Sequence, residues 1–211
     1  MEDNCVLRRE KIQAREALLP EVRREFSAAI ARRLTQMPEY RAAETVMLYR
    51  AVKGEVSLDG LSGKRFVWPL CIGEGEMIAL LPEDESAWQK GYCGIPEPVR
   101  RRSREIAPEE IDLVICPCTV FDPACRRMGM GKGFYDRFLS QCSKARFVAV
   151  AFEAQKTEQL TASPWDVPMD AVVTEKAVYR RLSHRFLETD GSVCQRTSQS
   201  LPCVRGGGKN L

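Results

Sequence analysis

The sequence predicts an α/β fold in which a mostly parallel sheet is flanked by helices and preceded by an N-terminal helical pair. Residues 112–118 and 146–153 are almost continuously apolar, which is typical of strands that are buried on both faces. A glycine-rich loop and a helix-like segment, residues 134–142, lie between these two runs. Strand, loop, helix and strand in this order make a βαβ unit, from which parallel sheets are built.

The remaining elements follow from the spacing of apolar residues. Residues 5–18 place apolar side chains among arginines in a short amphipathic helical pattern. Pro20 suits the first turn of a second helix, which ends before Pro38 and has an apolar stripe at Val22, Phe26, Ile30 and Leu34. Short β-branched and apolar runs predict further strands at residues 45–52, 64–71, 77–82 and 170–175.

Length and composition indicate one soluble globular domain. A chain of 211 residues can fill one core, which we place at residues 1–184. Residues 185–211 lack periodicity and are rich in Ser, Gly and Gln, so we expect a disordered or loosely docked tail. The net charge of +3 gives no argument for a nucleic-acid or membrane partner, and no apolar run approaches the length of a membrane span. The N-terminus is charged and has no secretory pattern, so we expect a cytoplasmic protein. We also expect it to be a monomer.

The cysteines predict neither disulfides nor a zinc site. There are nine, an odd number, scattered through apolar segments, and the chain has a single histidine. Cys116 and Cys118 form a C-x-C pair without a second half that could complete a zinc site. We therefore expect free, mostly buried thiols.

The stretch RRMGMGKGFYDRFL, Arg126 to Leu139, holds the main functional signal. Its glycines allow the backbone to approach a phosphate closely, and the following helix would present free N–H groups to it. Lys132 and Arg127 would add positive charge. The spacing matches neither the P-loop nor the dinucleotide-binding fingerprint, and a purely structural turn remains an alternative. Asp136 either complements the start of the helix or holds a Mg²⁺ that bridges to phosphates.

Four segments together resemble the 5-formyltetrahydrofolate cyclo-ligase family (5,10-methenyltetrahydrofolate synthetases). FDPACRRMGMGKGFYDRFL is similar to the family pattern F-D-x-x-G-x-R-L-G-x-G-x-G-[YF]-Y-D-R-x-L, and it is joined by GEV at 54–56, GIPEP at 94–98 and DVPMDAVVTE at 166–175. The resemblance implies an architecture like that of sugar isomerases and CoA transferases. It also implies the ATP- and Mg²⁺-dependent conversion of 5-formyltetrahydrofolate to 5,10-methenyltetrahydrofolate, with release of ADP and phosphate.

Matching residue by residue, the resemblance assigns roles within this chain. Lys132 and Arg127 would be catalytic. The ATP-binding set would be Arg8, Arg127, Met128, Gly129, Met130, Gly131, Lys132, Gly133, Phe134 and Tyr135. The substrate-binding set would be Arg50, Glu55, Met130 and Phe134. Asp136 would hold Mg²⁺, with Asp170 as a second ligand.

The chain also departs from the family pattern. Asn4 stands where a lysine is common, Cys93 where a large aromatic residue is common, and Cys125 where glycine is usual. The segment between the first two strands is short, so we expect a bare turn or a 3₁₀ element there. These departures motivate an alternative, a catalytically inactive relative that still binds nucleotide or folate. Two further alternatives are nucleic-acid binding through Arg100 to Arg102 and redox signalling through Cys116 or Cys118.

Overall fold

The computed structural model describes residues 2–91 and 94–182. Cys93 and the predicted tail, residues 185–211, lie outside the described residues. Every element named below belongs to one compact unit, Met1–Arg181.

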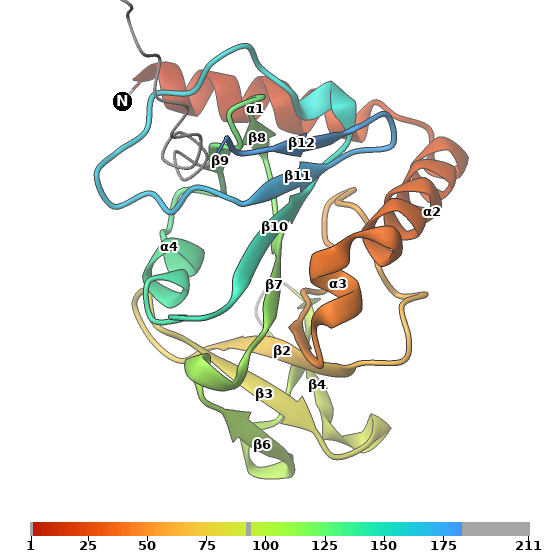
Figure 1. Ribbon diagram of the computed structural model, residues 1–211, viewed down its shortest axis with the longest axis vertical. Helices are drawn as coiled ribbons and strands as arrows, with labels where there is room; N and C mark the ends of the chain where they lie inside the picture. Colours follow the sequence, from red (N-terminus) through yellow and green to blue (C-terminus); the bar gives the residue numbers. More distant parts are fainter. Residues whose placement is uncertain (1, 92–93, 183–211) are drawn as a thin grey trace, which may run out of the picture. The chain divides into compact units, whose positions relative to one another are not determined.

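A mixed sheet forms the centre of this unit (Figure 1). Its strands, in spatial order, are β12 (Val178–Arg180), β11 (Ala171–Val173), β10 (Arg146–Val150), β7 (Leu113–Pro117), β1 (Thr45–Met47), β2 (Arg65–Cys71), β3 (Met77–Pro82) and β6 (Ser103–Ile106). Neighbours from β11 to β2 run parallel, whereas β12, β3 and β6 pair antiparallel at the two edges. The predicted mostly parallel sheet is therefore confirmed, with antiparallel edges that were not predicted.

The predicted N-terminal helical pair is also confirmed. It consists of α1 (Glu2–Glu16) and α2 (Pro20–Gln36), followed by the short α3 (Pro38–Ala42), which was not predicted. Pro20 and Pro38 each stand in the first turn of a helix, where a missing N–H group costs nothing. The fourth helix is α4 (Phe134–Leu139). Among the helices described, none is both long and apolar enough to span a membrane.

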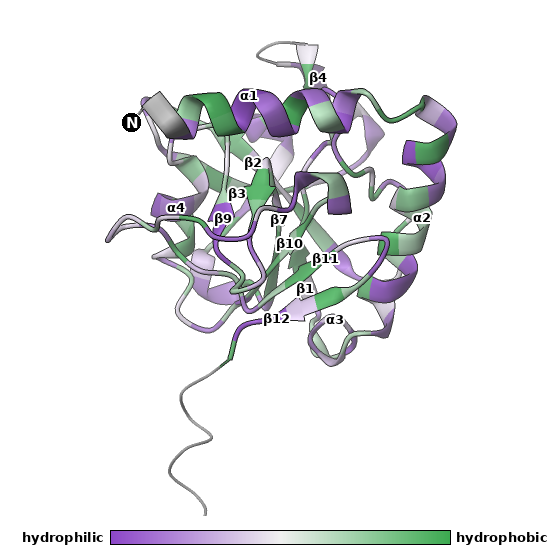
Figure 2. Cartoon of the chain, turned by 90° about the horizontal axis from the view of Figure 1, so that it is seen from above, coloured by the Kyte–Doolittle hydropathy of each residue, from purple (hydrophilic) through white to green (hydrophobic). Residues whose placement is uncertain are grey.

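Successive side chains of the central strands point to opposite faces of the sheet, and apolar clusters cover both faces. Leu113 and Ile115 of β7 pack in one apolar cluster with Ile30 and Leu34 of α2. Val114 and Cys116, which point the other way, pack with Phe138 and Leu139 of α4. Figure 2 shows the hydrophobic strands enclosed by helices of mixed hydropathy. Burial on both faces explains why this strand reads as an uninterrupted apolar run.

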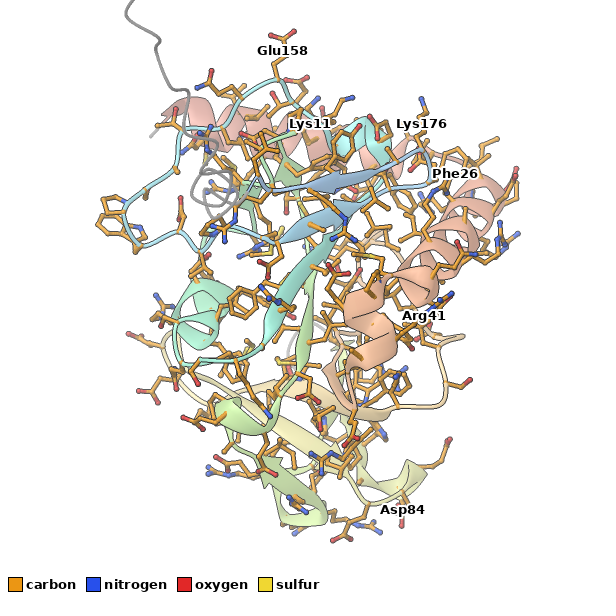
Figure 3. The ribbon with its side chains drawn as sticks, viewed as in Figure 1. Lys11, Phe26, Arg41, Asp84, Glu158 and Lys176 are labelled. Atoms are coloured by element: carbon orange, nitrogen blue, oxygen red, sulfur yellow. The ribbon has the colours of Figure 1, made fainter. Side chains whose placement is uncertain are left out.

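The two long helices, α1 and α2, lie at different places around the sheet. α1 lies across the end of the sheet where β7 and β10 finish, close to the 3₁₀ helix η5 (Glu153–Gln155) (Figure 1). α2 lies to one side, and Phe26, labelled in Figure 3, brings its ring centroid to 6.2 Å from that of Phe152. In parallel α/β sheets ligands bind beyond the carboxyl ends of the strands. α1 is therefore placed to contribute to a site there.

The connection from β1 to β2 contains neither a helix nor a strand, as predicted. A tight turn forms at Lys53 and Gly54, both with positive φ (47° and 76°). The Tyr49 hydroxyl donates to the Val56 carbonyl (2.7 Å) and fixes the segment that follows the turn. Two small hairpins elsewhere were not predicted: β4 (Trp88–Lys90) with β5 (Pro96–Pro98), and β8 (Val120–Phe121) with β9 (Arg127–Met128).

The cysteines of the described residues are free, as predicted. Cys116 and Cys118 are fully buried, and burial raises the pKa of each thiol to about 12. A reactive thiolate needs a lowered pKa, so redox signalling through these residues is disfavoured.

Cys125 supplies the first testable prediction. It replaces a glycine of the family pattern, it is fully buried, and its φ of 63° is in the left-handed region. Left-handed backbone costs a non-glycine residue about 1–2 kcal/mol, and a β-branched residue more. We expect Cys125→Val to lower the free energy of unfolding by about 2 kcal/mol or more. Cys125→Gly should be nearly neutral, because relief of backbone strain offsets the lost burial.

Urea unfolding followed by circular dichroism measures both variants of Cys125. A Cys125→Val protein as stable as the wild type would show that this turn carries no backbone strain.

Candidate active site

A large cavity of about 1010 Å³ lies against α1, the glycine loop and the sheet. Its walls come from separate parts of the chain: Asn4 and Arg8 of α1, the segment after β1, the strands β2, β4 and β5, residues 126–137, and residues 160–168. Ligand sites typically have volumes of roughly 300–1,000 Å³, so this space is large enough for a nucleotide and a second substrate together.

The glycine loop joins β9 to α4 and forms one wall of the cavity. Gly131 and Gly133 have φ of 93° and 68°, which L-residues with side chains rarely adopt. Arg8 donates from Nε to the Gly129 carbonyl (2.9 Å). Arg137 donates to the Lys132 carbonyl (2.5 Å) and to the Gly75 carbonyl (2.7 Å). The loop is therefore held by arginines from α1 on one side and α4 on the other.

The side chain of Lys132 is exposed at the cavity wall. Its positive charge acts on Cys71 of β2, which also lines the cavity. Burial raises the pKa of the Cys71 thiol, and the charge of Lys132 opposes that rise. α4 has only six residues, so its dipole adds little to the field in the cavity. The positive charge available to an anion here therefore comes mainly from side chains.

Arg127 and Asp136 form a partly buried ion pair beneath the loop. Arg127 Nη2 lies 3.2 and 3.3 Å from the two Asp136 carboxylate oxygens, and Nη1 donates to the Pro117 carbonyl (3.3 Å). The side chain of Arg127 is 3% exposed and that of Asp136 is 20% exposed. The arginine predicted to hold phosphate thus contacts the predicted metal ligand, and both residues line the cavity. Its guanidinium fixes the carboxylate in place.

Asp170 differs from the other predicted site residues, because it does not line the cavity. It precedes β11, and its carboxylate accepts the Phe147 N–H (2.9 Å) and lies 3.7 Å from Arg146 and 3.9 Å from Arg181. Its oxygens are thereby engaged in holding β10 and β11 together. The structure does not bring Asp170 to Asp136 within the cavity.

Asp166, which the sequence reasoning missed, does line the cavity. The next residue, Val167, donates its backbone N–H to Asp136 Oδ1 (3.4 Å), which brings this segment against Asp136. One Asp166 oxygen accepts the Ser163 N–H (2.7 Å). The signal was present in DVPMDAVVTE, which contains two aspartates, but the sequence did not show which of them faces the cavity.

Glu55 lies at another wall of the cavity, directly after the turn at Lys53 and Gly54. Oε2 accepts the Val52 N–H (3.1 Å), and Oε1 lies 3.8 Å from Nη1 of Arg15. The side chain of Glu55 is 9% exposed, and burial raises the pKa of its carboxyl group, opposed by the Val52 hydrogen bond and by Arg15. Arg15 was not among the predicted site residues.

Arg50 lies against two aromatic rings at one corner of the cavity. Its guanidinium carbon lies 4.3 Å from the Trp68 ring centroid and 4.4 Å from that of Trp88, and Nη1 lies 3.1 Å from Asp59. Such contacts between a guanidinium and aromatic faces are attractive. This corner places flat apolar surface and a positive charge side by side, which suits an aromatic ligand that bears carboxylates.

The remaining predicted residues are also brought to the cavity. Met128 to Tyr135 all line it, including Met130 and Phe134, and so does Asn4, where the family commonly has lysine. Lys11, labelled in Figure 3, is a base of α1 that could substitute for the lysine missing at position 4, but it does not line the cavity. Of the predicted site residues, only Asp170 lies outside the cavity wall.

Comparisons with known proteins identify the family of this chain. The profile of the 5-formyltetrahydrofolate cyclo-ligase family matches residues 1–175. The chain is 33% identical to the 5-formyltetrahydrofolate cyclo-ligase of Escherichia coli K12 over 178 residues, 79% of this chain and 97% of that protein. It is 26% identical to the mouse 5-formyltetrahydrofolate cyclo-ligase over 191 residues, 80% of this chain and 92% of the mouse protein.

Among solved structures, the 5,10-methenyltetrahydrofolate synthetase of Aquifex aeolicus superposes with a TM-score of 0.74 at 32% identity, covering 88% of this chain and 98% of that one. The Mycoplasma pneumoniae synthetase shares the fold, with a TM-score of 0.66 at 24% identity. The fold, the matched length and the identity to these relatives agree with one another. The chain belongs to the 5-formyltetrahydrofolate cyclo-ligase family, a family of ligases.

Proposed function

We propose that this protein converts 5-formyltetrahydrofolate to 5,10-methenyltetrahydrofolate at the expense of ATP, releasing ADP and phosphate. One observation carries the proposal: a single cavity is lined by the glycine loop with Lys132, by Asp136 and by Glu55. The loop and its cations suit a triphosphate, and the Glu55 carboxylate suits the N–H edge of a pterin ring.

The reaction needs positioning and charge neutralisation more than a protein nucleophile. The formyl oxygen attacks the γ-phosphorus and ADP leaves. N10 of the folate then attacks the activated carbon, the C–O bond to the phosphate breaks, and the N10 proton leaves with the phosphate as the ring closes. Lys132 and the glycine N–H groups would bind the phosphoryl oxygens as negative charge builds up on them. Glu55 would orient the pterin, and Arg50 would bind the substrate beyond it. Arg8 holds the loop through Gly129 and supports this geometry.

Asp136 and Asp166 fit a Mg²⁺ ion better than the predicted pair of Asp136 and Asp170. Mg²⁺ commonly binds one or two carboxylates together with substrate phosphates, and these two carboxylates line the same cavity as the loop. A bound Mg²⁺ would supply charge neutralisation at the phosphates of ATP. Arg127 would keep the Asp136 carboxylate in place for it.

The surroundings of the site support small molecules as partners. Arg100, Arg102 and Arg104 lie within 4 Å of the carboxylates of Glu105, Asp84 and Glu110, so the basic cluster near residue 100 is largely neutralised. Nucleic-acid binding needs a basic surface, which these ion pairs disfavour. We propose that the protein acts as a cytoplasmic monomer without a nucleic-acid or membrane partner.

An absorbance assay tests the proposed function. Purified protein is mixed with 5-formyltetrahydrofolate, ATP and Mg²⁺, and the near-ultraviolet band of the methenyl product is followed. We expect product formation that requires ATP and stops when Mg²⁺ is chelated. If nucleotide binds but no product forms, the protein is the inactive relative considered as the alternative. Salt-sensitive binding of RNA would instead contradict the proposed partners.

A further inference from the structure

Arg15 is a buried cation without an obvious structural reason. It lies in the last turn of α1, and its side chain is 1% exposed, unlike Arg9 on the same helix, which is exposed. Removing a guanidinium from water costs several kcal/mol unless a partner compensates for the charge. The amphipathic pattern of this helix predicts arginines at the surface. The burial of Arg15 therefore calls for a specific partner.

That partner is Glu55. Within the described residues, Arg15 makes one ion pair, between Nη1 and Glu55 Oε1 at 3.8 Å. In the same part of the chain, its Nε and Nη1 are buried without a hydrogen-bond acceptor. Arg15 does not line the cavity, whereas Glu55 does. The guanidinium thus contacts a carboxylate of the cavity wall without lining the ligand space itself.

The other groups around Glu55 do not replace this charge. The phenols of Tyr49 and Tyr135 and the thiol of Cys118 interact electrostatically with Glu55, and burial raises the pKa of all three, so they are neutral near pH 7. Lys53, on the same turn, is exposed, so water and salt screen its charge. Arg15 is the buried cation that opposes the desolvation of Glu55.

We propose that Arg15 is a positioning residue that holds the Glu55 carboxylate ionised and oriented toward the substrate. This inference rests on the proposed function, in which Glu55 accepts hydrogen bonds from the N–H edge of the pterin. A protonated Glu55 would present an O–H donor on one oxygen and lose part of that recognition. Arg15 therefore sets the pH range over which the folate binds, without touching the folate itself.

Kinetics against pH test this role. KM for 5-formyltetrahydrofolate is measured between pH 5 and 9 in the wild type, Arg15→Met and Arg15→Lys. Glu55 is ionised above its pKa, so KM should rise as the pH falls through that value. In Arg15→Met we expect this rise to begin at least about one pH unit higher, with kcat near the wild-type value at pH 9. Arg15→Lys, which keeps the charge, should restore most of the wild-type profile.

Arg23→Met is the matched control. Arg23 also lies beside this turn, with its side chain 3.6 Å from the position of a Cβ on Gly54, but it donates to the carbonyls of Leu18 and Glu16 rather than to Glu55. We expect a lower melting temperature and an unchanged KM profile. A profile shifted equally in Arg23→Met and Arg15→Met would overturn the proposal, because a general structural effect would then explain both.

A direct titration separates this proposal from the proposed function. Carboxyl ¹³C NMR of glutamate-labelled protein follows Glu55, with its signal assigned by Glu55→Gln. We expect the Glu55 midpoint to be at least about one pH unit higher in Arg15→Met than in the wild type. Equal midpoints refute the role of Arg15 whether or not the protein turns over folate. Should Arg15→Met fail to fold, Arg15→Gln, which removes the charge but keeps a polar side chain, is titrated in its place, and the same shift of the Glu55 midpoint is expected.

Discussion

Lys132→Ala is expected to lower kcat by about a thousandfold while leaving the protein folded. Lys132 is exposed at the wall of the cavity, and Arg8 and Arg137 hold the loop around it through the backbone carbonyls of Gly129 and Lys132. Its ammonium group would stabilise charge that develops on the transferred phosphoryl group. A loss of that charge raises the barrier by about 4 kcal/mol for a thousandfold effect. KM for ATP should change much less than kcat.

Two further variants make the result specific. Lys64 donates to the Arg41 carbonyl and does not line the cavity, so Lys64→Ala should leave turnover unchanged. Lys132→Arg keeps a positive charge with a different shape, and we expect partial activity between those of Ala and Lys. Circular dichroism and thermal melting confirm folding of each. Turnover of Lys132→Ala within a few fold of the wild type would remove Lys132 from the catalytic role.

The fold was largely predictable because its signals are local. The doubly buried strands β7 and β10 are continuous apolar runs, and the N-terminal helices have a clear apolar stripe and prolines in their first turns. The hairpin of β4 and β5 was not predictable in this way, because β5 reads Pro-Glu-Pro, with a proline at each end. Proline normally argues against a strand, and only an edge position tolerates it. Edge strands such as β12 are short and partly polar, so they also give a weak sequence signal.

The site was predictable where its residues are contiguous. Residues 127–136 all lie together in one loop and helix, so their shared location follows from the sequence. Arg15, Trp68, Trp88 and Asp166 come from distant segments, and only the fold brings them to this region. Arg15 was missed because an arginine on an amphipathic helix normally faces solvent. Asp170 was assigned from the family resemblance, and irregular chain has no period that would show that Asp166 faces the cavity instead.

Arg127 illustrates how burial changes an assignment based on residue type. An arginine beside a glycine loop suggests a direct grip on phosphate. Its guanidinium is almost fully buried and already contacts Asp136 and the Pro117 carbonyl. Its charge still contributes to the field at the loop. Its contacts, however, indicate that it orients the carboxylate, which links the phosphate site to the proposed metal site.

Asp136→Asn is the second variant with a large expected effect. It removes a charged metal ligand and leaves the buried Arg127 without its ion-pair partner. Loss of one carboxylate should weaken metal binding 10- to 100-fold, so the Mg²⁺ concentration for half-maximal turnover should rise by a similar factor. We also expect a lower melting temperature, because a buried charge without its partner is destabilising. Mg²⁺ titrations at saturating ATP, with a parallel thermal melt, measure the two effects separately.

Variants of the two other aspartates, Asp166 and Asp170, test which carboxylates bind the metal. Asp166 lines the same cavity as Asp136, and its neighbour Val167 contacts Asp136, so Asp166→Asn should raise the Mg²⁺ requirement in the same direction. Asp170 instead holds the Phe147 N–H and lies near Arg146 and Arg181, so Asp170→Asn should lower stability and leave the Mg²⁺ requirement unchanged. Because all three changes remove one carboxylate charge, net charge alone cannot produce a difference among them. A raised Mg²⁺ requirement in Asp170→Asn, with none in Asp166→Asn, would return Asp170 to the metal site.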